Sequence, residues 1–407
     1  MLPTWLTEEY LQPRLRDYYK DDQLKVLKIW DKQATEKGQN YVGLMTRIHV
    51  DYQQGDGVVQ NRTYIVKQAL SENVPQAQIF IEYDVYNREM DMYEFVLPKM
   101  KELLQEAGLD GKITADAITV DREYSTMILE DLAQSNFVNA DRVKQLDLAH
   151  TKLTLELLAK FHASSVVLKQ RHPNLLTKSL FTHFFARDKK GYTEVFNGIF
   201  RAFMRFINEH PELKRTYGGK LEKFSGLIME YGARIFDVNE DELQTLIHGD
   251  CWTTNIMFQY DDAGTPRSAI AIDFQFSNYT SPAVDLHYFF TVSLREEVQD
   301  LEPALVDKYY SDLKASLEQL AYAGAIPSLQ EFRLQFERRR FLSLLAHLFK
   351  PLIIYNGSEV TSDFSSVYKE TEEGLRFQKS IYDSEAVIRS ATRLLAILDD
   401  KGFLDLQ

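Results

Sequence analysis

Two short polar motifs, separated by an apolar segment, constrain this chain more than any other feature. Residues 248–255 read His-Gly-Asp-Cys-Trp-Thr-Thr-Asn, and residues 272–275 read Ile-Asp-Phe-Gln. The apolar run at 269–272 predicts a strand that holds the carboxylate of Asp273 rigidly at the edge of a cleft. Alone, either aspartate would be explained more simply as the cap of a turn. Two aspartates and an asparagine in this order favour an active site.

Asp250 and Asn255 have the spacing that phosphoryl transfer to an alcohol requires. A carboxylate such as that of Asp250 accepts or orients the proton of the attacking hydroxyl. Mg²⁺ prefers oxygen ligands and keeps several waters, so an amide and a carboxylate are enough protein ligands. We therefore predict that Asp250 is the catalytic base and that Asn255 and Asp273 bind the metal.

Four other polar residues, which could also be considered for the active site, are expected to have structural roles. His248 has the chemistry of a metal ligand or a base, but we favour a role in holding the loop through hydrogen bonds. Cys251, the only cysteine, has no visible partner that would make it a nucleophile. His162 lies on an apolar helix, where a hydrogen-bonded core histidine is the simpler interpretation. Asp285 resembles a helix start that caps or braces the catalytic loop.

A lysine at the end of a strand in the first half of the chain is predicted to contact nucleotide phosphates. Lys67 ends a strand-like segment, where its ammonium group can act as a point charge. Such a lysine needs an anionic partner. Glu89 flanks the apolar stripe of the helix predicted at residues 79–97, so it should border the buried face. Glu82, two turns earlier on the same face, is the main rival.

The sequence indicates the residues that would contact adenine and phosphate less clearly than it indicates Asp250, Asn255 and Asp273. Extended backbone from Glu130 to Leu132 follows a strand and can offer a carbonyl and an N–H group to adenine. The sequence contains neither a G-x-G-x-x-G nor a G-x-x-x-x-G-K-[ST] motif. The one candidate phosphate loop is segment 36–43, in which Gly38 or Gly43 would let backbone N–H groups approach phosphate. An ordinary hairpin turn is the alternative there.

The pattern of elements divides the chain into two parts. The first part contains about five strand-like segments and one long helix, preceded by a short entry helix at residues 7–20. The second part is mainly helical. We therefore predict an α+β fold with a nucleotide-binding lobe at residues 1–130 and a helical lobe at residues 131–407. The second lobe carries the catalytic loop at 248–255 and the metal-binding strand at 269–275.

The expected elements follow from hydrophobic periodicity. Pro98 is expected to end or kink the helix at 79–97. Strands are expected at residues 24–30, 41–52, 63–67, 117–120 and 125–129, and further helices at 146–167, 193–209, 220–236, 303–323, 330–350 and 384–399.

Charge and composition narrow the partners. The chain has 47 basic and 60 acidic side chains, a net charge of −13, which disfavours binding to nucleic acid or anionic membranes. The N-terminus does not resemble a signal peptide, and no stretch approaches the roughly 18 apolar residues of a membrane span. With a single cysteine, no disulfide framework is possible. We expect a cytoplasmic protein with no nucleic-acid, membrane or obligate protein partner.

Taken in order, these motifs resemble those of the choline-kinase-like and aminoglycoside-phosphotransferase-like superfamily. The closest resemblance is to the ecdysteroid kinase-like family, which is abundant in insects. Leu129-Glu-Asp-Leu132 and Asp273-Phe-Gln275 together are typical of the insect branch. The matching stretches are residues 64–67, 88–93, 97–98, 129–132, 158–163, 248–255, 272–275 and 282–286.

The resemblance implies a bilobal protein-kinase-like fold, with a small five-stranded antiparallel N-lobe that has one helix and a large helical C-lobe. It implies ATP and Mg²⁺ as co-substrates. The roles it implies are catalytic base for Asp250, metal ligands for Asn255 and Asp273, the phosphate-anchoring pair for Lys67 and Glu89, and hinge contacts for Glu130 and Leu132.

The sequence thus predicts an ATP-dependent kinase that phosphorylates a hydroxyl of a small molecule. Family resemblance points to a steroid or another bulky, largely apolar metabolite or xenobiotic. Alternatives are a pseudokinase that only binds a nucleotide or ligand, a choline- or ethanolamine-type kinase, and a metal-dependent phosphoesterase built on His248, Asp250 and Asp273. A protein kinase is disfavoured because no Ala-Pro-Glu element follows Asp273.

Overall fold

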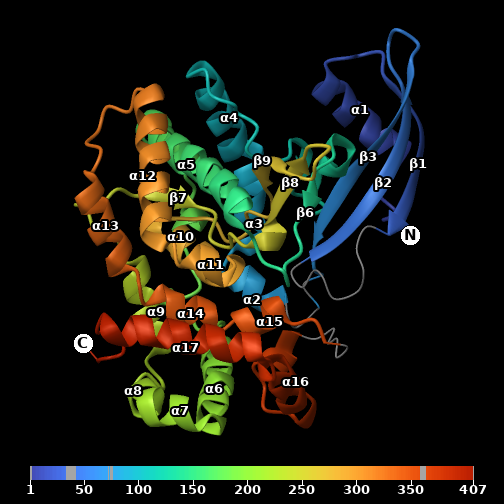
Figure 1. Cartoon of the computed structure of the whole chain (residues 1–407). Coiled ribbons are helices and arrows are strands. Elements are labelled where there is room, and N and C mark those ends of the chain that lie inside the picture. The colour runs from blue at the N-terminus through green and yellow to red at the C-terminus, as the bar shows by residue number, and fades with distance from the viewer. Residues whose placement is uncertain (1, 34–42, 72, 74–76, 358–363, 407) are drawn as a thin grey trace.

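The computed structural model describes residues 2–33, 43–71, 73, 77–357 and 364–406. Figure 1 shows a twisted sheet on one side and a larger mass of helices on the other, with a small group of strands between them. The larger sheet has five strands in the order β1-β2-β3-β5-β4, and every neighbouring pair is antiparallel. Its strands are β1 (Lys25–Gln33), β2 (Gly43–Gln53), β3 (Val59–Ala69), β4 (Ala117–Asp121) and β5 (Thr126–Glu130).

Strand alternation directs Lys67 toward the helical part. Successive side chains of a strand point to opposite faces. On β3, Tyr64 and Val66 are buried in a cluster that includes Leu11 and Leu15 of helix α1 (Glu8–Tyr19). This helix packs against β1 and β4. Lys67 therefore lies on the opposite face, in the centre of the sheet, paired with Met45 on one side and Met127 on the other.

The helix predicted at 79–97 is broken where the sequence did not indicate a break. The chain forms α2 (Ala77–Glu82), α3 (Val85–Asp91), a π-helical turn (Met92–Val96) and α4 (Leu97–Glu106). Of the two outcomes expected at Pro98, the helix does not end there, since α4 continues to Glu106, but regular α-helix is interrupted by the π turn directly before the proline. In the π turn the N–H of Leu97 donates to the carbonyl of Met92, and this widened turn accommodates the proline ring and its missing N–H.

The break instead lies at Asp84, which has a left-handed backbone with φ of 55°. Aspartate tolerates this conformation better than most residues. The chain changes direction between α2 and α3. The apolar residues expected to form one stripe along a single helix therefore lie on separate helices.

The helical part is built around α5 (Leu148–Arg171), the buried helix expected at 146–167. Helix α12 (Glu302–Gln319) lies beside it (Figure 1). The other helices are α6 (Thr193–Glu209), α7 (Pro211–Leu213), α8 (Gly219–Glu222), α9 (Ile228–Phe236), α10 (Ala283–Ser293), α11 (Glu296–Gln299), α13 (Leu329–Arg338), α14 (Leu342–His347), α15 (Lys350–Ile354), α16 (Glu372–Tyr382) and α17 (Glu385–Asp400).

Two small sheets bring the sequence motifs together. Strands β7 (Thr245–Ile247) and β10 (Asn278–Thr280) pair antiparallel, while β8 (Ile256–Tyr260) pairs with both β6 (Val138–Asn139) and β9 (Pro266–Ala271). The first motif ends where β8 begins, and the second begins where β9 ends. The β8–β9 hairpin therefore places them side by side, and the N–H of Ile272 donates to the carbonyl of Asn255 at 3.0 Å.

The described residues form the α+β, two-part architecture that the sequence predicts. Contacts between the parts are direct: the N–H of Ala271 donates to the carbonyl of Ile113 at 3.0 Å. The division into lobes at residue 130 stays a prediction. Among the residues described, none of the helices combines the length and apolar character needed to cross a membrane.

Candidate active site

One buried carboxylate, that of Asp285 on α10, holds the loop at 248–255. It accepts hydrogen bonds from the backbone N–H of His248 at 2.7 Å and of Gly249 at 2.9 Å. Gly249 has φ of 81°, and a Cβ atom there would lie 2.1 Å from the carbonyl oxygen of Phe276. Only glycine therefore fits at this turn. Asp285 braces the loop, as its position in the sequence indicates.

Asp285 is itself fixed by a buried histidine. Its Oδ2 contacts Nε2 of His162 at 3.0 Å, and Nδ1 of that histidine contacts the hydroxyl of Tyr309 at 2.6 Å. Burial opposes ionisation of Asp285, but the hydrogen bond and charge of His162 outweigh it and lower the pKa of Asp285. His162 is thus a hydrogen-bonded core histidine, and the brace is a charged group fully enclosed by protein.

Replacement of Asp285 by alanine is expected to lower the free energy of unfolding by about 3–5 kcal/mol, because three buried donors lose their acceptor. Urea denaturation at pH 7 measures this loss. Since folding lowers the pKa of Asp285, its stabilisation should also fade as the pH drops through that lowered value. The exposed Asp262 provides the control: Asp262→Ala should change stability by less than about 0.5 kcal/mol. Equal stability of the two variants would contradict the brace.

His248 joins the two motifs. Its Nε2–H donates to the carbonyl of Ile272 at 2.9 Å, and its Nδ1 accepts from the N–H of Asp250 at 3.3 Å. Burial lowers the pKa of His248, which keeps the ring neutral. Both ring nitrogens are used in holding backbone, which is the loop-holding role expected for it. Burial likewise raises the pKa of the Cys251 thiol, so this cysteine is an inert core residue.

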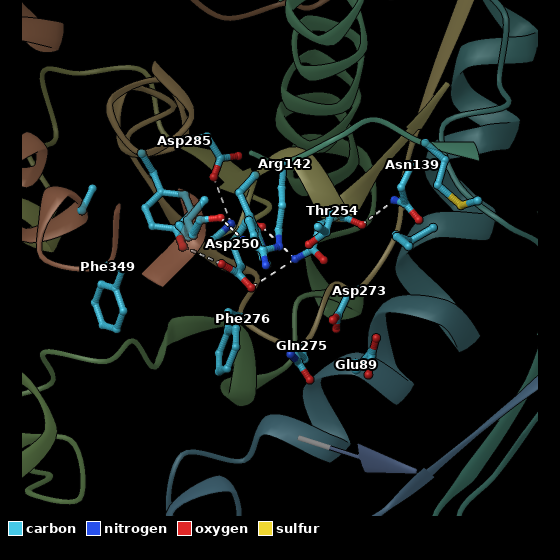
Figure 2. Close-up of a pocket in the computed structure, with 18 of the residues that line it drawn as sticks. Glu89, Asn139, Arg142, Asp250, Thr254, Asp273, Gln275, Phe276, Asp285 and Phe349 are labelled. Atoms are coloured by element: carbon cyan, nitrogen blue, oxygen red, sulfur yellow. Dashed lines mark hydrogen bonds between the residues drawn. The ribbon is translucent and has the colours of Figure 1, made fainter. Parts of the chain in front are cut away.

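The carboxylate of Asp250 lies at the centre of the site (Figure 2). Its Oδ1 accepts from the hydroxyl of Tyr288 at 2.9 Å, and its Oδ2 accepts from Nδ2 of Asn255 at 3.1 Å. Burial, helped by the negative charge of Asp273, raises the pKa of Asp250 to about 8. A carboxylate with a pKa near neutrality is suited to take up a proton during a reaction.

Asn255 and Asp273 present oxygen atoms to the same cavity. Nδ2 of Asn255 is used by Asp250, through its Oδ2 and through its backbone carbonyl at 2.9 Å. Within the described part of the chain, no donor contacts the amide oxygen of Asn255. Asp273 has a left-handed backbone with φ of 70°, a strained conformation of the kind found at functional sites. These two oxygen ligands suit Mg²⁺, which is completed by water and substrate phosphates.

No group of three or more His, Cys, Asp or Glu side chains that could hold a metal ion occurs among the described residues.

A buried ion-pair cluster links the sheet to the second motif. Nζ of Lys67 lies 2.7 Å from Oε1 of Glu89 and 2.7 Å from Oδ1 of Asp273. Burial opposes the charge of Lys67, but the two carboxylates raise its pKa above its ordinary value. The rival Glu82 lies elsewhere: its carboxylate accepts from the N–H of Lys190 at 3.1 Å. The structure thus selects Glu89 as the partner of Lys67.

One cavity of about 910 Å³ connects these groups. At one end it is lined by apolar residues of the sheet and of the β8–β9 hairpin, namely Met45, Ile65, Ala115, Leu129, Leu132, Met257 and Ile272. At the other end its wall is mainly aromatic and comes from the helical part. We call this end the aromatic chamber: Phe184, Tyr192, Phe196, Phe276, Tyr288 and Phe349. Lys67, Asp250, Asn255 and Asp273 line the cavity between the two ends.

The predicted hinge lies beside the first end. The Glu130 side chain points to Lys112, 2.5 Å away, and Leu132 begins a short 3₁₀ helix (Leu132–Ser135). Sequence reasoning missed Asp131, whose carboxylate accepts from Nε of Arg47 at 2.7 Å and anchors this segment to the sheet. Gly43 is the first residue of β2 and pairs with Ala69. Residues 36–42 of the candidate phosphate loop lie outside the described residues.

Sequence reasoning also missed the aromatic chamber and Tyr288. Tyr288 lies three residues after Asp285, so both must occupy neighbouring faces of α10. That spacing was the available signal. The chamber has no such signal, because its members come from three separate segments, at residues 184–196, 276–288 and 349. In space they touch: the rings of Phe184 and Phe276 lie 4.5 Å apart, and those of Phe196 and Phe349 lie 5.6 Å apart.

A five-stranded antiparallel sheet, a helical part and an intervening cavity with a Lys67–Glu89 pair define a bilobal kinase-like fold. The sequence profile of the ecdysteroid kinase-like family matches residues 37–322, and the chain belongs to this family. No curated protein matches the sequence.

Two solved structures show similarity of shape at low sequence identity. An ethanolamine kinase of Plasmodium vivax is 12% identical with a TM-score of 0.39, over 94% of this chain and 90% of that chain. An aminoglycoside-3'-phosphotransferase of type VIII is 13% identical with a TM-score of 0.35, over 83% and 99%. Similarity at this level does not bear on what this chain binds or transforms.

Proposed function

We propose that this protein is an ATP- and Mg²⁺-dependent kinase that transfers the γ-phosphoryl group of ATP to an alcohol hydroxyl of a small molecule. The observation that carries the proposal is the position of Asp250. Its partly buried carboxylate lies between the Lys67–Asp273 ion pair and the aromatic chamber, within one cavity. Phosphate-binding groups on one side and an apolar chamber on the other suit transfer from a nucleotide to an organic acceptor.

The sheet end of the cavity would take the nucleotide. Its apolar lining suits the faces of an adenine ring. Leu132 begins a 3₁₀ helix, and the first N–H groups of a helix have no acceptor within the helix. The N–H of Leu132 and the backbone of Glu130 would bind the edge of the adenine ring. Lys67, held by Glu89, would bind the nucleotide phosphates. Backbone N–H groups near Gly43 would complete the phosphate contacts.

Asn255 and Asp273 would hold Mg²⁺, which when bound neutralises phosphate charge and orients the phosphates for in-line transfer. Oδ1 of Asp273 lies 2.7 Å from Nζ of Lys67. We infer that nucleotide phosphates take over Lys67, which frees the carboxylate of Asp273.

Transfer itself would use the carboxylate of Asp250. The acceptor oxygen forms a bond to the γ-phosphorus as the bond from this phosphorus to the β–γ bridging oxygen breaks, and ADP leaves. The hydroxyl proton passes to Oδ1 or Oδ2 of Asp250. Tyr288 and Asn255 hold the carboxylate toward the acceptor through their hydrogen bonds. The elevated pKa makes the carboxylate a stronger base than an ordinary aspartate.

The acceptor would be a bulky, largely apolar alcohol such as a steroid. The aromatic chamber buries large ring surfaces, and aromatic side chains supply much apolar area to a ligand. A choline- or ethanolamine-type acceptor is the second candidate, because Trp252, Tyr288 and Phe349 pack in one cluster and aromatic faces attract quaternary ammonium groups. We also propose that residues 1–130 form the nucleotide-binding lobe and residues 131–407 the acceptor-binding lobe.

Release of ADP, measured with Mg·ATP and a panel of alcohols, tests this proposal. The panel contains hydroxysteroids including an ecdysteroid, together with choline and ethanolamine. We expect hydroxysteroids to stimulate ADP release and the small amino alcohols to give none. Phe276→Ala should raise the KM for the best steroid by about tenfold or more, and the KM for ATP should stay unchanged, because the chamber does not contact the nucleotide.

Other outcomes assign other functions. Stimulation by choline alone would favour the second candidate. Thermal stabilisation by Mg·ATP without turnover on any alcohol would indicate a pseudokinase, since a ligand that binds the native state raises Tm without any reaction. Phosphate release from a monoester in the absence of ATP would indicate a phosphoesterase and overturn the proposal.

A further inference from the structure

The cationic side chains that line the cavity differ in their partners. Lys67 is paired with two carboxylates, and Arg47 is paired with Asp131 at 2.7 Å. Arg142 also lines the cavity, but its one contact is to the backbone carbonyl of Ile353. Of the described residues that line the cavity, Arg142 is therefore the cation without a carboxylate partner. No carboxylate neutralises the positive charge of Arg142 there, so this charge is available to an anionic ligand.

Two hydrogen bonds of the preceding residues hold the backbone around Arg142. Nδ2 of Asn139 donates to the carbonyl of Thr254 at 2.7 Å, which ties this segment to the catalytic loop. Oδ1 of Asp141 accepts from the N–H of Val143 at 3.0 Å, which closes a turn around Arg142. Figure 2 shows the side chain of Arg142 extending toward Asp250. Arg142 is thus held on a rigid turn beside the point of transfer.

The guanidinium group has donors to spare. It carries five N–H donors in a planar fork that matches phosphate oxygens. The contact to Ile353 is the one hydrogen bond that Arg142 makes to the described residues, and it occupies a single donor. That contact holds the guanidinium between the turn and α15 while the remaining donors stay free for a ligand.

The negative charge around the proposed site of phosphoryl transfer requires a cation to offset it. The carboxylates of Asp250 and Asp273 lie in the same part of the cavity and repel a phosphate. In phosphoryl transfer, charge spreads over the three equatorial oxygens of the transferred group, and a preorganised arginine stabilises it. Lys67 reaches the cavity from the sheet, whereas Arg142 reaches it from the helical part, so the two cations approach from different sides.

We propose that Arg142 is a catalytic residue that binds the oxygens of the γ-phosphoryl group and stabilises them during transfer. This inference rests on the proposed kinase function. Arg142 keeps its proton throughout the step. The hydroxyl proton of the acceptor goes to Asp250, the acceptor oxygen forms the new bond to phosphorus, and the electron pair of the broken bond leaves with ADP.

The experiment compares a nucleotide that lacks the γ-phosphoryl group with one that carries this group on a β–γ imido bridge. Full-length wild-type protein, Arg142→Ala and Arg142→Lys are titrated with ADP and with the non-hydrolysable analogue AMP-PNP in MgCl₂, and Kd is measured by calorimetry. We expect Arg142→Ala to weaken AMP-PNP about tenfold or more while the Kd for ADP changes less than about twofold. Its kcat for ADP release should fall about 10²-fold, and Arg142→Lys should recover part of both losses.

Lys144→Ala is the matched control. Lys144 is a cation on the same turn, its side chain is 76% exposed, and it does not line the cavity. We expect its Kd values for both nucleotides to equal those of the wild type. A general electrostatic effect would instead weaken AMP-PNP in this variant as well, and would overturn the assignment to Arg142.

Three further results separate the possibilities. Equal weakening of ADP and AMP-PNP in Arg142→Ala would overturn the inference, because it would place the arginine away from the γ-phosphate. A rise in the KM for the acceptor alone would also overturn it and indicate that the contact to Ile353 only shapes the chamber. Failure of the wild type to bind either nucleotide would instead refute the proposed function itself, and this inference with it.

Discussion

Asp250→Asn should lower kcat for phosphorylation of the best acceptor alcohol by about 10²–10⁴-fold, the usual loss when a general base is removed. Asparagine has nearly the same shape as aspartate but cannot accept the hydroxyl proton. The KM for ATP should change little, because Asp250 lies on the acceptor side of the Lys67–Asp273 pair. Release of ADP at saturating Mg·ATP measures the effect. Unchanged turnover would remove Asp250 from the reaction.

The same variant has an expected signature in stability that a damaged fold would not show. Folding raises the pKa of Asp250 to about 8, whereas an unfolded aspartate ionises near 4. The folded state therefore binds the Asp250 proton more tightly, and wild-type stability falls as the pH rises between about 4 and 8. Asparagine does not ionise, so this loss is absent from the variant.

Thermal unfolding in EDTA at pH 5 and at pH 8 measures this difference. We expect the Tm of Asp250→Asn relative to wild type to be higher at pH 8 than at pH 5, by roughly 2–5 °C. The exposed Asp262→Asn is the control and should show no such change with pH. A relative Tm that is the same at both pH values would show that Asp250 ionises normally in the folded protein.

Lys67→Met should have the second large effect, on both stability and turnover. The change leaves Glu89 and Asp273 facing each other without the cation that separates them, and Glu89 is 2% exposed. Removal of one partner from a buried ion pair costs about 3–5 kcal/mol. We expect that loss in urea denaturation, and a fall in kcat/KM for ATP of about 10²–10³-fold because the phosphates lose their point charge.

A second change separates the two effects. Replacing a buried ion pair by apolar residues is often neutral, so Lys67→Met combined with Glu89→Leu should regain most of the lost stability. It should not regain turnover, because the cation is still missing. Glu82→Gln, on the preceding helix, should alter neither property, since Glu82 does not contact Lys67. Full activity in Lys67→Met would contradict the phosphate-binding role.

Much of the fold could be predicted because its signals are local. The helical periodicity of residues 193–209 predicts α6 with the bounds that it has. Residues 146–167 are apolar on more than one side, which predicts the buried helix α5, and this helix begins two residues after the expected start. The breaks were harder to predict. Asp84 and the π turn before Pro98 depend on how α2, α3 and α4 pack against other segments, and hydrophobic spacing alone does not contain that information.

The sequence by itself determined the chemical groups and their order: a lysine on a strand, a glutamate on the next helix, then Asp250, Asn255 and Asp273 around one hairpin. Those groups are recognisable because each motif lies within a few residues, where chain geometry limits the possible arrangements. The roles assigned to them stay predictions that the experiments above test.

Only the tertiary structure decided which groups meet. It paired Lys67 with Glu89 rather than Glu82, linked His162 to the loop at 248–255 through Asp285, and brought Arg142 to the cavity that Asp250 lines. It also assembled the aromatic chamber from α6, α10 and distant loops. The physical reason is that periodicity specifies which face of a helix is buried, whereas the partner of that face follows from packing between segments far apart in the chain.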